Sequence, residues 1–388
     1  MQRVLISGAG IAGPTLAYWL LQWGFEPTII ERSPSFRTGG YIVDFWGAGF
    51  EVADRMNLLP ELRRQGYDVT AVRLVGADGA RVGGFSADIF RRYLSQRYVS
   101  IRRGDLATEI YEQVASDVEI LFGDSIKAIR EESADVTVSF KQNADRKFDL
   151  LVGADGLHSE VRKLVFGSQD HFETNLGYNV AAFSATGYSP RDENTYVAYS
   201  SPGKQIARFA LRDDTTIFFV IYKSNQSVAD LDPQSSLQAV LQDEAWECRN
   251  ILEAMRDADD LYFDSVSQIR MPSWSKGRVA LIGDAAFCVS LLAGEGSSLA
   301  MTSSYVLAGE LKHAAGNFEQ AFRRYEERLR PLISEKQKSA KKFARWFAPD
   351  SPVDLFLRNQ FTKLFDIPML ARWFVQNSFA DNVVLPHY

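Results

Sequence analysis

Cysteine and histidine are scarce in this chain of 388 residues. The 2 cysteines, Cys248 and Cys288, lie far apart in the sequence, and the 4 histidines are scattered. These counts exclude a disulfide framework and a four-ligand zinc site, and they argue against a metal-centred enzyme. We therefore expect no bound metal and a reducing, cytoplasmic compartment.

Excess positive charge and long apolar runs are also lacking. Lys and Arg number 43 against 49 Asp and Glu, a net charge of −6, whereas nucleic-acid-binding proteins concentrate Lys and Arg. The first residues, MQRVLISGAG, lack the apolar core and cleavage site of a signal peptide. No run reaches the ~18 apolar residues of a membrane span. We expect a monomer with no nucleic-acid partner and no membrane span.

Aromatic residues, by contrast, are plentiful. The chain has 26 Phe, 15 Tyr and 7 Trp, which together make 12% of its residues. Flat apolar side chains can form ordinary core, or they can line a pocket for a flat ligand. Composition alone leaves both interpretations open.

The N-terminal segment has the pattern of a dinucleotide-binding unit. A short apolar run over residues 3–7 predicts a strand, helix-spaced apolar residues over 11–23 predict a helix, and residues 27–31 predict a second strand. A strand, turn, helix and strand in this order open a Rossmann-type βαβ unit.

The turn of this unit carries Gly8, Gly10 and Gly13, which fit the G-x-G-x-x-G fingerprint. The first glycine permits the tight turn, the second lets backbone approach a pyrophosphate, and the third allows close packing of helix and strand. Glu31 ends the second strand, where a carboxylate can accept hydrogen bonds from ribose hydroxyls. The fingerprint predicts a dinucleotide site but does not distinguish FAD from NAD.

Three later segments strengthen this prediction. They are RGDL at 103–106, DLLVGADGLHSEVR at 149–162, and LIGDAAFCVSLLAGEGSS at 281–298. Each alone is compatible with a helix cap or an ordinary turn between strand and helix. Their order and spacing together indicate a cofactor site.

The remaining pattern predicts a second sheet and a helical tail. Residues 69–85 alternate like a hairpin, and alternating strands fill about 175–268 around one helical stretch at 235–255. Such strands form an antiparallel sheet with one face covered. The aromatic tail, 352–388, is expected to be helical and to pack across both domains. The basic residues of 336–342 are predicted to form a solvated face.

With GAGIAG, Glu31, the GADG segment with Arg162, and Gly283-Asp284 in place, the chain resembles the single-component (group A) FAD-dependent aromatic monooxygenases of the p-hydroxybenzoate hydroxylase type. The resemblance spans about residues 1–340. Within that class the chain is similar to tetracycline-inactivating monooxygenases and polyketide hydroxylases. The stretches that carry this finer similarity are Tyr18-Trp19-Leu20, Arg37–Gly40, Arg103–Leu106 and Met271–Gly277.

The resemblance implies an α/β fold: a Rossmann-type, glutathione-reductase-like FAD-binding domain, an inserted, mainly antiparallel β-sheet substrate domain, and a C-terminal helical extension. The expected parts are 1–68, 101–175 and 271–344 for the FAD-binding domain, 69–100 and 176–270 for the substrate domain, and 345–388 for the helical extension.

The same resemblance implies the residues that hold FAD. Gly8, Gly10 and Gly13 would hold the pyrophosphate, Glu31 the adenosine ribose, and 294–298 would lie against the flavin ring. The full expected set is Gly8, Gly10, Ile11, Ala12, Gly13, Glu31, Arg32, Arg37, Gly40, Arg103, Asp155, Gly156, Arg162, Gly283, Asp284, Gly294, Gly296, Ser297 and Ser298.

Three positions near the expected flavin ring depart from the family. Leu291 and Glu295 stand where Pro and Gln are common, and Phe287 stands where His or Tyr is frequent. A carboxylate at Glu295 would disfavour a reduced, anionic flavin if it pointed at the ring.

The class implies the reaction. NADPH or NADH reduces FAD transiently, O2 adds at the flavin C4a position, and the hydroperoxide hydroxylates an aromatic or polyketide-like polycyclic substrate, such as a tetracycline antibiotic. The cofactor carries the chemistry, so no catalytic side chain is assigned. Phe183, Arg208 and Phe218, on predicted strands, are the candidates to line the substrate pocket, although each can equally be ordinary core.

Two alternatives stay open at this point. One is an FAD-dependent reductase or dehydrogenase of the same fold, which never forms the hydroperoxide. The other is a non-catalytic FAD-fold binding protein, which the departures at Glu295 and Phe287 favour.

Overall fold

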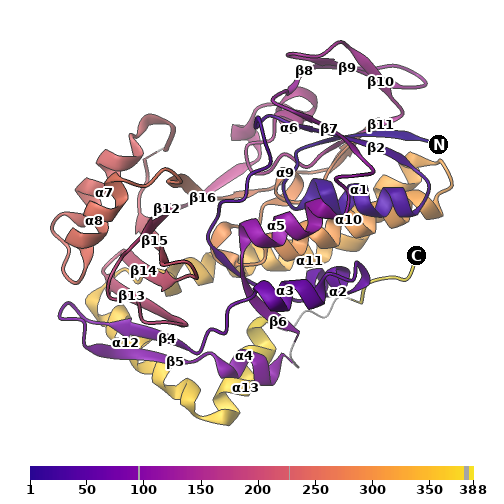
Figure 1. The fold of residues 1–388 in the computed structure, drawn as a ribbon. Coiled ribbons are helices and arrows are strands. Elements are labelled where there is room, and N and C mark those ends of the chain that lie inside the picture. The colour runs from indigo at the N-terminus through magenta and orange to yellow at the C-terminus, as the bar shows by residue number, and fades with distance from the viewer. Residues whose placement is uncertain (95–96, 227, 380–383) are drawn as a thin grey trace.

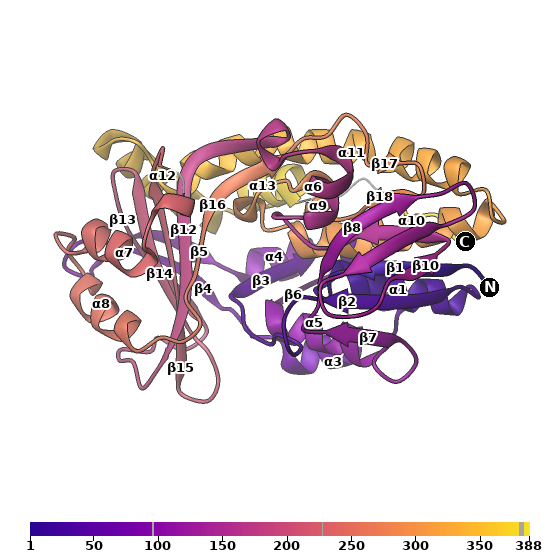
Figure 2. The same cartoon turned by 90° about the horizontal axis from the view of Figure 1, so that it is seen from above.

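The protein is described here from a computed structural model, which covers residues 1–94, 97–226, 228–379 and 384–388. Two sheets dominate it, and Figures 1 and 2 show them side by side with helices on their outer faces. Because strands far apart in the sequence meet in each sheet, the chain crosses several times between the two parts.

The first part is built on a six-stranded sheet in the order β17-β18-β11-β1-β2-β7. Its central strands pair in parallel, with Leu5 of β1 facing Thr28 of β2 and Leu151 of β11. Strand bounds are β1 Arg3–Ser7, β2 Glu26–Glu31, β7 Glu119–Phe122, β11 Leu150–Gly153, β17 Ser275–Lys276 and β18 Val279–Leu281. The short apolar runs are fully buried here, as in parallel sheets covered on both faces.

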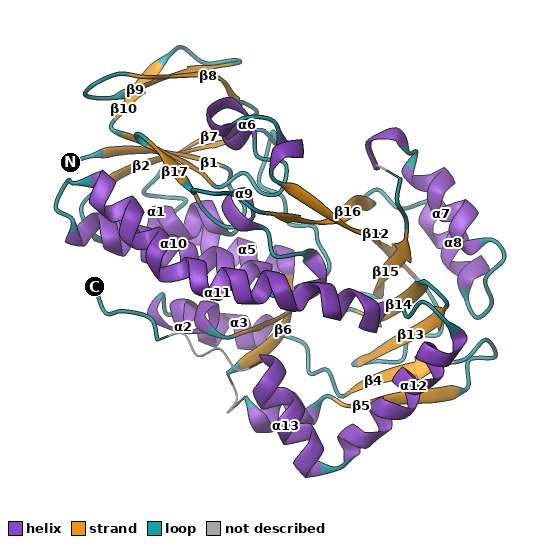
Figure 3. Ribbon diagram, turned by 180° about the vertical axis from the view of Figure 1, so that it is seen from behind, coloured by secondary structure: helices purple, strands orange, loops and turns teal. Residues whose placement is uncertain are grey.

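Helices and a small sheet surround this core. The helices are α1 Ala12–Gln22, α2 Ala48–Arg55, α3 Leu59–Gln65, α5 Arg103–Glu112, α6 Glu160–Phe166, α9 Asp284–Phe287, α10 Gly296–His313 and α11 Phe318–Phe347. The small sheet consists of β8 Ile126–Glu131, β9 Val136–Phe140 and β10 Arg146–Phe148. Figure 3 shows α11 running beside α10 toward the second sheet.

The second part is a seven-stranded sheet in the order β16-β12-β15-β14-β13-β4-β5. Its strands are β4 Ala71–Val75, β5 Arg81–Ser86, β12 Glu173–Thr186, β13 Thr195–Ser201, β14 Lys204–Ala210, β15 Thr215–Lys223 and β16 Tyr262–Ile269. Helices α7 (Pro233–Leu241) and α8 (Cys248–Arg256) lie on one side of it, at the outer edge of the molecule in Figure 2. The sheet class is as predicted. The six domain boundaries stay a prediction.

Two strands that the sequence pattern did not indicate join the parts. β3 (Ile42–Trp46) pairs antiparallel with β6 (Tyr98–Arg102), and α4 (Asp88–Tyr93) precedes β6. The single helical stretch expected over 235–255 is two helices, interrupted at 242–247. This interruption matters because it contains Glu247, which pairs with Arg208.

The C-terminal tail packs on both parts, as expected. Helix α12 (Pro352–Lys363) lies on β5, and α13 (Pro368–Phe379) lies on α4. The last residue, Tyr388, returns to the first part, where its ring lies 5.4 Å from that of Tyr305 and its hydroxyl donates to Glu310 at 2.8 Å. No helix in the described ranges is both long and apolar enough to cross a membrane.

Candidate active site

The glycine turn after β1 is shaped by close backbone contacts. Gly8 has φ +110°, and a Cβ there would lie 2.6 Å from the carbonyl oxygen of Ala154. A Cβ at Gly13 would lie 1.9 Å from the oxygen of Gly8. Ile11 and Ala12 are buried and lead directly into α1. The turn therefore requires glycine, and it points the first N–H groups of α1 toward a ligand at the end of β1.

Glu31 closes this turn from the second strand. Its carboxylate accepts hydrogen bonds from the N–H groups of Ala9 and Ser33, each at 2.9 Å, and the residue is buried. The neighbouring Arg32 and the predicted Arg37 are exposed. The carboxylate is thus held beside the glycine turn, where a ribose would lie.

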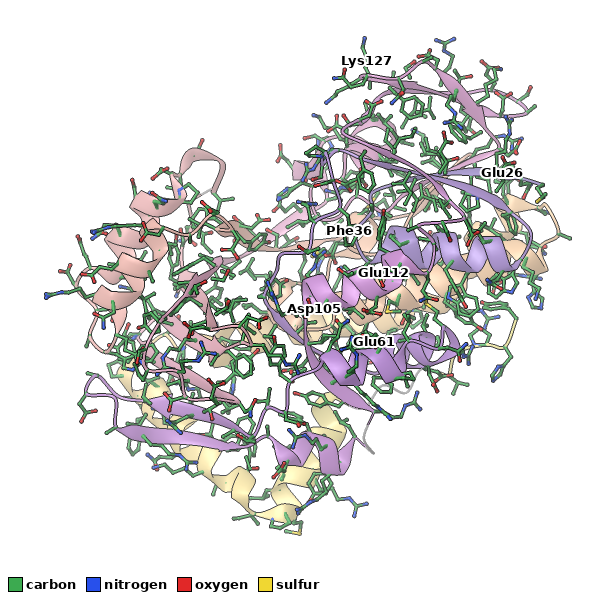
Figure 4. The ribbon with its side chains drawn as sticks, viewed as in Figure 1. Glu26, Phe36, Glu61, Asp105, Glu112 and Lys127 are labelled. Carbon is green, nitrogen blue, oxygen red and sulfur yellow. The ribbon has the colours of Figure 1, made fainter. Side chains whose placement is uncertain are left out.

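Arg103 brings a cation to the same turn. It starts α5, its N–H donates to the carbonyl of Tyr41 at 2.9 Å, and its guanidinium lies 3.8 Å from where a Cβ at Gly10 would be. The backbone at Gly40, with φ +140°, packs closely against Arg103. A Cβ on Gly40 would lie 3.2 Å from the Cβ of Arg103. Figure 4 labels Asp105, two residues further along α5, next to the junction of the two parts.

The polar groups of the GADG segment, residues 153–156, are largely used in hydrogen bonds within the fold. The Asp155 carboxylate accepts from Ser159 Oγ at 2.5 Å and from the N–H groups of Glu160 and Val161 at 2.9 and 3.1 Å, so it caps α6. Burial raises the pKa of Asp155, and these hydrogen bonds oppose the rise. Gly156, with φ +78°, makes the turn between them.

Arg162 is fully buried and ties α6 to α9. Its guanidinium donates to the carbonyls of Ala285 at 2.9 Å and Leu157 at 2.6 Å, and to Gln169 Oε1 at 2.9 Å. These contacts place it behind the Asp284 turn. In the structure Asp155 and Arg162 therefore position this segment, and the cofactor contact that the resemblance implies for them stays a prediction.

Asp284 and the second glycine pair complete the site. Gly283 (φ +57°) lies two residues after the end of β18 and is the N-cap residue of α9, and the Asp284 carboxylate lies 3.9 Å from where a Cβ at Gly296 would be. Burial raises the pKa of Asp284, and the charge of Arg103 opposes the rise. Gly296 begins α10. Arg103, Asp284 and the start of α10 therefore meet at one place, although they are distant in the sequence.

The two serines after Gly296 differ. Ser298 is buried, and its hydroxyl accepts a hydrogen bond from the N–H of Gly49 at 2.9 Å, which joins α10 to α2. Ser297 is partly exposed, and Gly294 is exposed, with φ +68°. Of this pair, Ser297 is the one whose surface is open to a ligand.

An aromatic group that the sequence analysis did not select faces this site. The ring of Tyr41 lies 6.2 Å from that of Phe219 and 6.3 Å from that of Tyr262. Burial raises the pKa of Tyr41 to about 12. The nearby charge of Arg103 opposes this rise, and that of Asp284 adds to it. Tyr41 thus connects the cofactor-side residues to the seven-stranded sheet.

The three predicted substrate residues lie on the opposite face of that sheet. Phe183 and Phe218 stack with ring centres 4.9 Å apart, in a core shared with α7 and α8. Arg208 is 2% exposed and pairs with Glu247 at 2.7 Å and Asp192 at 2.7 Å. Successive strand residues point to opposite faces, so Phe218 faces away from the site because Phe219 faces it. Their role toward a substrate stays a prediction, and their place on this face does not support it.

The missed residues gave little local signal. Phe218 and Phe219 are adjacent and equally apolar, so alternation could not tell which one faces the site. Tyr41 precedes β3, a strand that was not predicted, and Trp46, on the same strand, would lie 3.5 Å from a Cβ at Gly294.

These residues fit FAD. The glycine turn at β1 leaves no room for a Cβ, and the buried Glu31 and the Arg103 guanidinium lie beside it. This combination provides N–H donors and a cation for a pyrophosphate, and a carboxylate for a ribose. The start of α10, a separate element beside Asp284, provides a second turn with free N–H groups. The fold and the site define an FAD-binding α/β protein.

Comparison with known proteins agrees. Residues 97–335 match the FAD binding domain family. A flavin-dependent monooxygenase from an unknown prokaryotic organism is 36% identical over 339 residues, covering 86% of this chain and 87% of that protein. A flavin-dependent monooxygenase of Legionella longbeachae is 31% identical over 399 residues, covering 100% and 98%. The crystal structure of tetracycline destructase Tet(51) matches with TM-score 0.85 and 32% identity over 100% of both chains. The chain belongs to the flavin-dependent monooxygenase family.

Proposed function

We propose that this FAD-dependent monooxygenase hydroxylates a flat, polycyclic phenolic or polyketide substrate, with a tetracycline as the candidate substrate to test first. The observation that carries the proposal is the group of Tyr41, Phe219 and Tyr262 between the glycine turns and the seven-stranded sheet. Aromatic faces at this spacing favour a flat ligand. The similarity to tetracycline destructase Tet(51) supports the same choice.

FAD, when bound, supplies the redox and oxygen chemistry, with NADPH or NADH as reductant and O2 as co-substrate. The chain's own residues bind and orient. Gly8, Gly10, Gly13 and Arg103 would hold the pyrophosphate, and Glu31 the adenosine ribose. Asp284 would contact the ribityl or pyrophosphate portion, and the N–H groups of 294–298 would face the flavin ring.

The substrate would lie against this ring edge, between Trp46 and the aromatic group. Tyr41, Phe219 and Tyr262 would orient it, and the surrounding apolar surface would limit the access of water. The Tyr41 hydroxyl is protonated at neutral pH, as in an ordinary tyrosine, and burial raises its pKa further, to about 12; it could therefore donate a hydrogen bond to a substrate oxygen. We also propose a monomer in the cytoplasm, which the scarcity of cysteine supports.

A substrate panel tests the function. Purified yellow protein is mixed with NADPH or NADH and a series of tetracyclines and polycyclic phenols, under ¹⁸O2, and products are analysed by mass. We expect substrate-dependent NAD(P)H oxidation and a product that gains one labelled oxygen. Rapid NAD(P)H oxidation with H2O2 formation and no labelled product across the panel would instead indicate a reductase.

A further inference from the structure

The segment that would face the flavin ring is held by side chains of α11. Residues 288–295 connect α9 to α10 with only one short 3-10 turn, η3 (Leu291–Ala293), of their own. The carbonyl of Cys288 accepts a hydrogen bond from Gln337 Nε2 at 3.3 Å, and that of Val289 accepts one from Gln268 Nε2 at 2.9 Å. Gln268 also donates to the carbonyl of Gln337 at 2.8 Å. The start of the segment is therefore fixed by α11 and β16.

The end of the segment is fixed by an ion pair. Lys336, which neighbours Gln337 on α11, donates from Nζ to the carboxylate of Glu295. The two side chains are only 13% and 9% exposed. The basic stretch of 336–342 therefore departs from the predicted solvated face at Lys336, while the side chains of residues 341 and 342 lie outside the described residues.

Glu295 occupies a position where a free carboxylate would interfere with an anionic ligand. It is the N-cap residue of α10, directly before Gly296. Acidic N-cap side chains ordinarily accept hydrogen bonds from the first-turn N–H groups of the helix. Among the described atoms, the Glu295 side chain makes no such capping bond. Its carboxylate is directed to Lys336 instead.

We propose that Lys336 is a positioning residue for the flavin. It holds the Glu295 carboxylate away from the start of α10, so that the N–H groups of Gly296 and Ser297 stay available to the anionic edge of the reduced flavin. It also cancels the negative charge that Glu295 would place beside the ring. The inference rests on the proposed placement of the ring at 294–298. It explains how this chain accommodates a glutamate there.

Without Lys336, the carboxylate has two effects. It can turn back to cap α10, where it competes with the flavin for the same N–H groups. Loss of the Lys336 cation also leaves the charge of the mostly buried Glu295 carboxylate less compensated, which disfavours electron uptake by the ring. Both effects disappear if Glu295 is neutral.

The test compares four variants of the FAD-loaded enzyme. Lys336→Met and the double variant E295Q/K336M are compared with the single variant Glu295→Gln and with the matched control Lys338→Met, which removes an exposed lysine from the same helix. The measurements are the FAD dissociation constant, by flavin fluorescence, and the flavin midpoint potential, by equilibration with reference dyes. Neither measurement needs a substrate.

We expect Lys336→Met to weaken FAD binding about tenfold, the effect of roughly 1.4 kcal/mol, and to lower the midpoint potential. The double variant should return both values close to those of the wild type, and Glu295→Gln alone should raise the potential. Lys338→Met should leave both unchanged.

Three results would overturn the proposal. The first is a Lys336→Met protein whose FAD dissociation constant and midpoint potential equal those of Lys338→Met. The second is a double variant whose two values do not return to those of the wild type, which would mean that Lys336 supports only the fold. The third is an unchanged midpoint potential in Glu295→Gln. The last measurement decides the question even if Lys336→Met does not fold. Failure of the proposed function would be distinguishable from failure of this inference. The wild-type enzyme would then transfer no oxygen to any substrate, while the variants would still change FAD affinity and midpoint potential as expected.

Discussion

Two adjacent phenylalanines on β15 should have opposite roles, and replacing each with leucine tests which face of the sheet meets the substrate. Phe218 is fully buried and contacts Phe183 and Tyr188 with ring centres 4.9 and 4.8 Å apart. Phe219 is partly exposed and has Tyr41 as its ring neighbour, at 6.2 Å. Leucine keeps the apolar character at either position and removes only the ring.

The expected magnitudes follow from these contacts. Phe218→Leu loses two aromatic pairs at about 0.5–1.5 kcal/mol each, so the free energy of unfolding should fall by about 1–3 kcal/mol. At about 2.1 cal/mol/K of unfolding entropy per residue, a chain of 388 residues shifts its melting temperature by about 1.2 °C per kcal/mol, so the melting temperature should fall by roughly 1–4 °C. Its KM for the substrate should not change. Phe219→Leu should lower the unfolding free energy by less than about 1 kcal/mol and should raise KM about two- to tenfold, since one ring contact to the substrate is lost.

Thermal unfolding followed by circular dichroism gives the first quantity, and steady-state NAD(P)H oxidation coupled to product formation gives the second. The reasoning is refuted if Phe218→Leu raises KM at unchanged melting temperature, or if the two variants behave alike. Either result would mean that the α7–α8 face, and not the Tyr41 face, meets the substrate.

Three further predictions follow from single contacts. Arg208→Met should lower the unfolding free energy by about 3–5 kcal/mol, because it leaves the Glu247 carboxylate in a mostly buried position without its cation; urea unfolding measures this, and a raised KM at unchanged stability would restore the substrate role. Gly13→Ala should abolish stable FAD binding, since its Cβ would lie 1.9 Å from a backbone oxygen; a purified variant that stays yellow after gel filtration would contradict this. The hydrogen bond to Asp264 raises the pKa of His158 in the folded protein. Protonated His158 therefore stabilises the fold below about pH 6.5, and this stabilisation is lost as the pH rises through the higher folded pKa. Melting temperatures across this range should therefore decline more in the wild type than in His158→Gln, and parallel profiles would exclude the pair.

Local sequence patterns predicted the glycine turn after β1 and its surroundings. A glycine that must accept φ +110° beside a carbonyl, a helix start and an acid at the end of the second strand are all short-range features, and they appear in the structure at Gly8, α1 and Glu31. Their geometry depends on a few neighbouring residues, so the sequence carries it directly.

The residues of the seven-stranded sheet that face the site could not be predicted from local sequence patterns. Which of two adjacent strand residues faces the site depends on how the whole sheet is placed, and for Phe218 and Phe219 this is decided by the packing of α7 and α8. The loop between these helices also supplies Glu247, which pairs with Arg208 on the face that carries α7 and α8.

The sequence by itself therefore determined the class of fold and the glycine turn at Gly8–Gly13, because these depend on composition and on contacts between near neighbours. Only the tertiary structure decided which aromatic residues lie on the face of the sheet near Arg103 and Asp284, and that Glu295 is paired with Lys336, 41 residues further along the chain. Such pairs form when helices and sheets pack, and their spacing in the sequence carries no trace of that packing.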